Sequence, residues 1–127
     1  MSASQASAID AVALQLAGAL DKYDAETAAM VAGWPDMELY RSVSGQVERI
    51  RMYSAALPAA SVLWVELLIA HAELVHLLWQ TQYGSKPTDA AQIAARRDRH
   101  SDCILALRNR CLHLPGERQP AGSGAHA

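Results

Sequence analysis

The sequence predicts an all-α protein, and three observations support this fold class. Apolar residues recur at helical spacing in four successive segments, proline or glycine separates these segments, and no run alternates apolar and polar residues as a half-buried strand does. At 127 residues the chain is long enough for one hydrophobic core and too short for two. Because short connections favour antiparallel neighbours, we expect an up-down four-helix bundle over residues 1–114.

Proline, glycine and capping residues set the expected helix ends. The first helix stops at about residue 32, because residues 33–35 are Gly-Trp-Pro. The second follows Asp36, whose carboxylate can cap a helix, and ends near residue 56, before Pro58. The third spans about residues 59–83 and stops at Gly84.

The fourth expected helix begins at Pro87 and Thr88, which are typical of a helix entry. Residues 115–127 are rich in glycine, proline and alanine, so we expect a disordered C-terminal tail. Residues at helical spacing predict the face of the fourth helix that points inward: Ile93, His100, Ile104, Leu107, Cys111 and Leu114.

The third expected helix is apolar over most of its circumference. Residues 62–79 are apolar enough to suggest a membrane span, but Glu66, His71, Glu73 and His76 would each be costly in lipid. We therefore expect a helix of a soluble bundle and no membrane association. One bundle would leave part of its apolar surface in water, which indicates either a homodimer or a helix packed on several sides.

Charge and cysteine content limit the classes of function. The formal charge of -2 provides no global attraction to nucleic acid, so such binding needs a local basic patch. Lys22 is the first basic residue and Asp10 interrupts the early apolar stretch, so we expect a cytoplasmic protein without a secretory signal. Cys103 and Cys111 lie roughly 12 Å apart along one helix, beyond the disulfide reach of about 7 Å, so reduced thiols are expected.

A buried polar layer is predicted across the middle of the bundle. Folding the helices about their loops places Tyr23, Gln46, His71 and His100 at one level, on the apolar sides of their helices. One interpretation is a hydrogen-bonded network that fixes helix register. The other is a metal or cofactor site with His71, His100 and Cys103 as zinc ligands and Asp24 as a fourth candidate, although no metal-binding spacing motif supports it. We otherwise expect no cofactor.

Residues 108–113 carry the most informative pattern in the chain. Arg108 is followed directly by Asn109, and His113 lies five positions after the arginine, near the end of the last expected helix. This arrangement resembles the signature of the HEPN superfamily, in which an arginine, a polar residue and a histidine four to six positions after the arginine lie on a late helix of a short helical bundle. The structural alternative is a helix end whose basic residues complement the dipole.

The resemblance implies a metal-independent endoribonuclease of toxin or phage-defence type, with RNA as substrate and a partner antitoxin protein. His113 would transfer protons, Arg108 would stabilise charge on the phosphorus centre, and Asn109 would orient the phosphate or the histidine. Other HEPN domains do no catalysis and bind nucleotides or partners, which is the second function expected for this chain. Some HEPN toxins carry a tyrosine two residues after the histidine that an antitoxin modifies, and here that residue is Pro115.

The spacing of the motif raises a geometric problem. Five residues correspond to about 140° of rotation, so Arg108 and His113 do not share one face of a regular helix. The resemblance implies a solution, because HEPN ribonucleases dimerise with both motifs in one cleft between subunits. Unwinding of the helix before Pro115 would also reorient His113.

A basic patch is the predicted RNA-binding surface. The same folding brings Arg49 and Arg51 to the bundle end that carries Arg108 and Arg110, with Asp21 and other acidic residues in the middle or at the opposite end. Tyr53 would offer a stacking surface for a base. The alternative is solvated arginines partly paired with Glu48. For Arg96, Arg97 and Arg99 we expect local ion pairs with Asp98 and Asp102.

Overall fold

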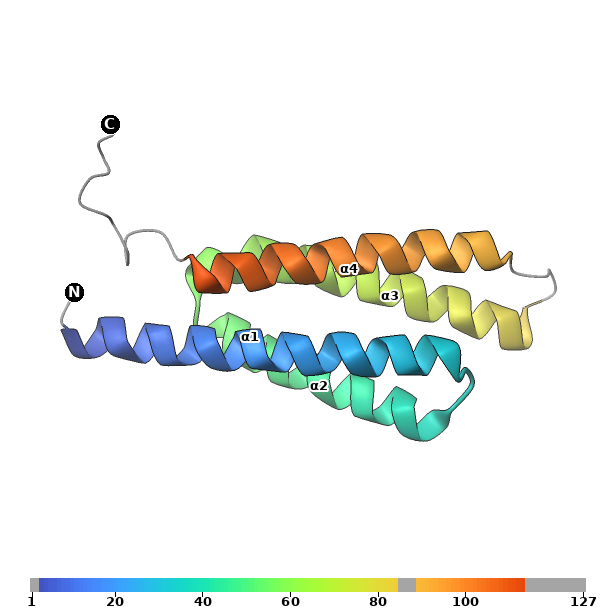
Figure 1. Ribbon diagram of the computed structural model, residues 1–127, viewed down its shortest axis with the longest axis horizontal. Helices are drawn as coiled ribbons and strands as arrows, with labels where there is room; N and C mark the ends of the chain where they lie inside the picture. Colours follow the sequence, from blue (N-terminus) through green and yellow to red (C-terminus); the bar gives the residue numbers. More distant parts are fainter. Residues whose placement is uncertain (1–2, 85–88, 114–127) are drawn as a thin grey trace, which may run out of the picture.

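The computed structural model describes residues 3–84 and 89–113, and over these residues the chain is an antiparallel up-down bundle of four α-helices (Figure 1). The expected fold class is therefore confirmed. Pro87, Thr88, Leu114 and the predicted tail lie outside the described residues. The elements are α1 (Ala3–Ala32), α2 (Met37–Ala55), the short 3₁₀ helix η1 (Pro58–Ala60), α3 (Ser61–Tyr83) and α4 (Ala90–Leu112).

Side-chain caps explain where two helices begin. The Asp36 carboxylate accepts hydrogen bonds from the backbone N–H groups of Glu38, at 3.0 Å, and Leu39, at 3.2 Å, so the predicted cap of α2 is confirmed. At α4 the cap is Asp89, whose side chain accepts from Ala91 N at 2.9 Å. The sequence interpretation did not assign this role to Asp89.

The end of α3 requires glycine because of space. Gly84 follows the last helical residue, as expected, and its φ of -76° lies in the range that any residue adopts. A Cβ atom at this position would lie 2.5 Å from the backbone oxygen of Gln80. Glycine therefore permits a close approach of two backbone segments here.

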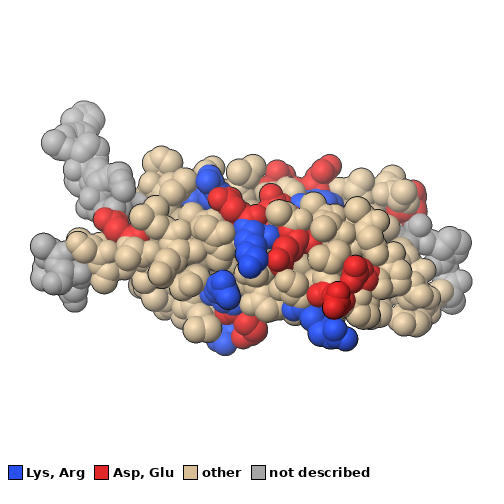
Figure 2. Space-filling model, turned by 60° about the horizontal axis from the view of Figure 1, so that its bottom comes forward, with Lys and Arg blue, Asp and Glu red and all other residues tan. Residues whose placement is uncertain are grey.

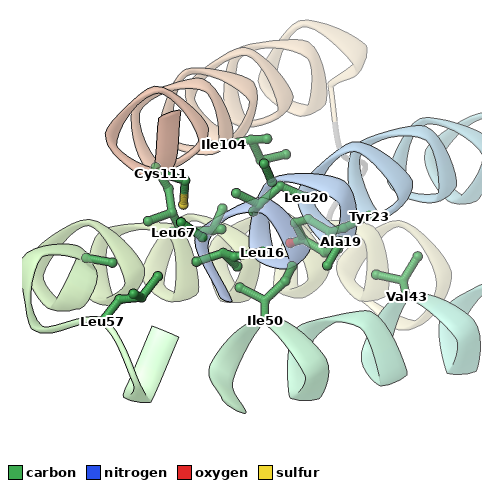
Figure 3. Close-up of a cluster of buried hydrophobic side chains, with 14 of the residues drawn as sticks. Leu16, Ala19, Leu20, Tyr23, Val43, Ile50, Leu57, Leu67, Ile104 and Cys111 are labelled. Atoms are coloured by element: carbon green, nitrogen blue, oxygen red, sulfur yellow. The ribbon is translucent and has the colours of Figure 1, made fainter. Parts of the chain in front are cut away.

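The core lies along the bundle axis where the helices meet. Helix α1 packs against α2 and α4, and α3 packs chiefly against α4 (Figure 1). Large aliphatic side chains from different helices interdigitate in this core (Figure 3). On α4 the described part of the predicted stripe is confirmed, because His100, Ile104, Leu107 and Cys111 are buried and Ile93 is half-buried.

Helix α3 combines a buried face with an exposed apolar face. It is buried at Leu67, Ala70, Leu74 and Leu78, but Val62 is 68% exposed. Among the described residues, the segment Pro58–Tyr83 is the one stretch long and apolar enough to cross a membrane by length and composition, and only 22% of its most apolar window is buried. The predicted surplus of apolar surface on this helix is confirmed.

Candidate functional site

Arg108 lies against the neighbouring helix α1. Its Nε donates to Oδ1 of Asp21 at 2.8 Å, and its Nη2 lies 3.4 Å from Oδ2 of the same carboxylate. The pair is accessible to solvent, with 59% of the Asp21 side chain exposed. The sequence interpretation placed Asp21 away from the motif, and this expectation is wrong because α1 and α4 are adjacent along their lengths.

His113 is the residue directly after α4 and is exposed. Its Nδ1 lies 3.0 Å from the backbone oxygen of Asn109. A carbonyl oxygen only accepts, so Nδ1 carries the proton of the neutral imidazole and Nε2 is its basic nitrogen. The contact also satisfies one of the carbonyl groups that the end of a helix leaves without an intrahelical partner.

Arg108 and His113 are not joined by any contact within the described part of one chain. Arg108 is bound to α1, whereas His113 is bound to the backbone of its own helix. Asn109 contributes its backbone oxygen to His113 and is itself exposed. The geometry agrees with the expected 140° separation, so a combined action of both residues requires a second chain or a different conformation of the helix end.

The arginines expected to contact RNA share one end of the bundle, but carboxylates lie among them. Helices α2 and α4 both end at this side of the molecule (Figure 1), which brings Arg49, Arg51 and Arg110 to it. Arg51 pairs with Glu48 at 2.9 Å, as in the alternative interpretation. Figure 2 shows basic and acidic side chains interspersed on the displayed face. Because Arg51 pairs with Glu48 and Arg108 with Asp21, the positive potential at this end is weaker than the four arginines (Arg49, Arg51, Arg108 and Arg110) suggest.

The remaining members of the predicted RNA surface have mixed environments. Arg110 donates from Nη1 to the backbone oxygen of Ala59 at 3.1 Å, which ties the end of α4 to η1. Arg49 is exposed, and Tyr53 is half-buried against the core, with only part of its ring accessible. Of this group, Arg49 is the side chain most available to a phosphate.

The predicted polar layer is present in the centre of the bundle. The Tyr23 hydroxyl on α1 lies 2.7 Å from Nδ1 of His71 on α3 and 2.6 Å from Nε2 of His100 on α4. Tyr23 and His100 are fully buried. Gln46 is also buried, but its Oε1 makes no hydrogen bond within the described residues. One phenol thus links three helices, so the network interpretation is confirmed for Tyr23, His71 and His100, whereas Gln46 is not joined to them through Oε1.

Arg97 determines the direction of these hydrogen bonds. Its Nη1 lies 3.3 Å from Nδ1 of His100, and a guanidinium only donates, so Nδ1 accepts and the His100 proton lies on Nε2. His100 Nε2–H then donates to the Tyr23 oxygen, and the Tyr23 hydroxyl donates to His71 Nδ1. His71 therefore carries its proton on Nε2. The result is one directed chain from Arg97 to His71.

Two residues other than the histidines hold Arg97 in place. Its Nη2 donates to Oδ1 of Asp24 at 2.7 Å and to the Asp24 backbone oxygen at 3.2 Å, and its Nη1 donates to the Ser101 hydroxyl. The expectation of local pairs with Asp98 and Asp102 is wrong for all three arginines, because Arg97 pairs with Asp24 on α1, and Arg96 and Arg99 pair with Glu73 on α3. The spacing of three residues between Arg97 and His100 places both on one face of α4, and this signal was available in the sequence.

Burial keeps the three central groups neutral at pH 7. It lowers the pKa of His100 to about 3, and the Arg97 guanidinium and His71 shift it in the same direction. Burial also lowers the pKa of His71 and raises the pKa of the Tyr23 hydroxyl. Neutral imidazoles are what the directed chain requires, because each needs one donor and one acceptor nitrogen.

The same geometry argues against the zinc interpretation. The two imidazole nitrogens that face the centre are occupied by the Tyr23 hydroxyl, and Asp24 binds Arg97. Cys103 and Cys111 are free thiols, as expected. No group of three or more histidine, cysteine, aspartate or glutamate side chains in the described chain is arranged to hold a metal ion. The described residues therefore favour the hydrogen-bonded network over the zinc site that the sequence left open.

Aromatic residues form a second feature at the opposite end of the bundle. Trp34, Tyr40 and Trp79 pack edge to face, and Tyr83 stacks on Trp79 with ring centroids 5.5 Å apart. Beside them an open hollow of about 370 Å³ is lined by His76, Gln80 and other residues of one helix end. It lies at the C-terminal end of α3, whereas residues 108–113 lie beside the N-terminal end of α3.

Comparison with known protein families, with characterised proteins and with solved structures gives no match to this chain.

Proposed function

We propose that this protein is a HEPN-like, metal-independent endoribonuclease of toxin or phage-defence type that acts as a homodimer. The observation that supports the proposal is the state of His113 at the end of the Arg108-Asn109-x3-His113 motif. Its imidazole is held through Nδ1 and exposed, with Nε2 as its basic nitrogen. An exposed imidazole nitrogen that can accept a proton is what attack by a ribose 2′-hydroxyl needs.

Each motif residue has a distinct role in the proposed reaction. His113 Nε2 takes the proton from the 2′-hydroxyl, and the oxygen attacks the adjacent phosphorus. The 5′-oxygen leaves with the Nε2 proton of the second His113 of the dimer, which enters this step as an imidazolium and ends it neutral. Arg108 stabilises the additional negative charge on the phosphoryl oxygens, and Asn109 orients the phosphate. The products are a 2′,3′-cyclic phosphate and a 5′-hydroxyl.

Asp21 occupies the guanidinium of Arg108 before RNA binds. The Arg108–Asp21 pair is exposed, and exposed ion pairs contribute only about 0–1 kcal/mol. A phosphodiester competes for the same donors through charge-assisted hydrogen bonds. In this proposal Asp21 holds the guanidinium of Arg108 against α1, and the scissile phosphate replaces the carboxylate.

An RNA cleavage assay in the presence of EDTA tests the proposal. The parent protein should yield 2′,3′-cyclic phosphate ends, and His113→Ala and Arg108→Ala should each lose cleavage by at least about a hundredfold. Gln92→Ala is the control, because Gln92 is also an exposed polar residue on α4 but lies outside the motif. An inactive parent, or cleavage that survives in His113→Ala, contradicts the proposal.

The exposed apolar face of α3 favours a second function, a non-catalytic helical module that binds a partner or nucleotide. This function predicts self-association or partner binding without RNA cleavage. The same assay separates the two functions, since a folded parent protein that associates but leaves RNA intact supports the binding module alone.

A further inference from the structure

The outward face of α3 carries an uncharged apolar stripe with a regular spacing. Val62, Val65 and Ile69 are 68%, 50% and 47% exposed, and Ala72 is exposed as well. Steps of three, four and three residues are the seven-residue repeat of a coiled-coil seam. We call Val62, Val65, Ile69 and Ala72 the α3 seam.

The bundle does not use the α3 seam. Helix α3 faces the core with Leu67, Leu74 and Leu78, which lie about half a turn from Val65 and Ile69 at about 100° per residue. Leu68, which is 39% exposed, extends the apolar surface on one side. Contiguous exposed apolar surface of this kind is typical of an interface.

We propose that the α3 seam pairs with the α3 seam of a second copy of this chain, as two parallel helices. A two-fold axis joins identical patches, and the α3 seam is free of charge along its length. The proposal names the subunit contact that the proposed nuclease requires.

Charge distribution beside the seam selects the parallel orientation. Glu66 is exposed on one flank, and in a parallel pair it lies next to Ser61 and Leu68 of the other chain. An antiparallel pair that buries the same four residues is centred at residue 67, midway between positions 62 and 72. It sets the two Glu66 carboxylates side by side, which is unfavourable.

The parallel pair has a consequence for the motif. Helix α4 runs antiparallel to α3 and is tied to η1 by the bond between Arg110 and Ala59, so its end lies at the start of α3. Two parallel α3 helices therefore bring both copies of His113 to the same end of the dimer. The proposed reaction needs this arrangement, because it uses one imidazole from each chain.

Sedimentation velocity over a range of protein concentrations tests the pairing. The parent should be a dimer, and Val65→Lys and Ile69→Lys should each raise the dimer dissociation constant by at least about tenfold, because each places a charge in the seam. Leu105→Lys is the matched control: Leu105 is 54% exposed but lies on α4, so its dimer should persist. Circular dichroism confirms that each variant is folded.

Oxidative cross-linking tests the orientation. In a Cys103→Ser background, Val62→Cys should give a covalent dimer, because a parallel pair places the two residues 62 opposite each other. Leu14→Cys, at an equally exposed apolar position on α1, should not. Absence of a cross-link at residue 62 in a protein that dimerises contradicts the parallel orientation.

Three results would overturn the pairing itself. These are a parent that stays monomeric at all concentrations, a dimer that Val65→Lys and Ile69→Lys leave intact, and a monomer whose seam binds phosphatidylcholine vesicles instead. Failure of the nuclease proposal gives a different pattern, since His113→Ala keeps the dimer whatever its effect on RNA cleavage.

Discussion

Replacing Tyr23 with phenylalanine removes the hydroxyl that hydrogen-bonds to both His71 and His100. In the variant His100 Nε2–H has no acceptor in a site with no exposed surface, and His71 Nδ1 loses its donor at a half-buried position. A buried polar group without a partner costs about 1–3 kcal/mol, and the half-buried one costs less because water can reach it. We expect Tyr23→Phe to lower the free energy of unfolding by about 2–4 kcal/mol.

Urea unfolding followed by far-UV circular dichroism measures this loss. Tyr53→Phe is the matched control, because Tyr53 packs against the core and its hydroxyl makes no hydrogen bond within the described residues. It should change stability by no more than about 0.5 kcal/mol. Equal effects of the two substitutions, or a Tyr23→Phe loss below about 0.5 kcal/mol, would refute the argument that the hydroxyl satisfies both imidazoles.

Two further predictions concern pH and the motif. The pKa of His100 is lowered from an unfolded value near 6.5 to about 3, so below pH 6.5 the unfolded state binds a proton that the folded state does not. The free energy of unfolding should therefore fall by about 2 kcal/mol between pH 7 and pH 5, and His71 should add to this loss. Urea unfolding at a series of pH values measures it, and a free energy of unfolding that does not change over this range would contradict the prediction. Asp21→Asn frees the guanidinium of Arg108, so RNA binding measured by fluorescence anisotropy should tighten about two- to fivefold at low salt. Asp10→Asn is the control, because Asp10 also lies on α1 but has no contact to the motif, and it should change RNA binding little. Weaker RNA binding by Asp21→Asn would show that Asp21 helps to position Arg108.

The local signals in the sequence were sufficient for the fold class, the start of α2 and the ends of α1, α2 and α3. Helical spacing of apolar residues, the Asp36 cap and the stops at Pro35, Pro58 and Gly84 depend on residues close in the chain, so they can be read without knowledge of packing. The level of Tyr23, His71 and His100 could also be found by counting residues from the loops, because antiparallel helices rise at the same rate.

Only the tertiary structure decided which partners the charged residues meet. The side of a neighbouring helix that faces Arg97 or Arg108 depends on the rotation of each helix about its axis, and the sequence pattern leaves that rotation open by several tens of degrees. The sequence therefore favours nearby acidic residues such as Asp98 as partners, whereas Asp24 and Asp21 on α1 hold the two guanidinium groups. The sequence by itself determined four helices, their order and one polar layer, because these follow from local periodicity. The hydrogen bonds that join that layer and the environment of the motif required the packed bundle, because they depend on contacts between helices, such as Tyr23 with His100 and Arg108 with Asp21, which are 77 and 87 positions apart.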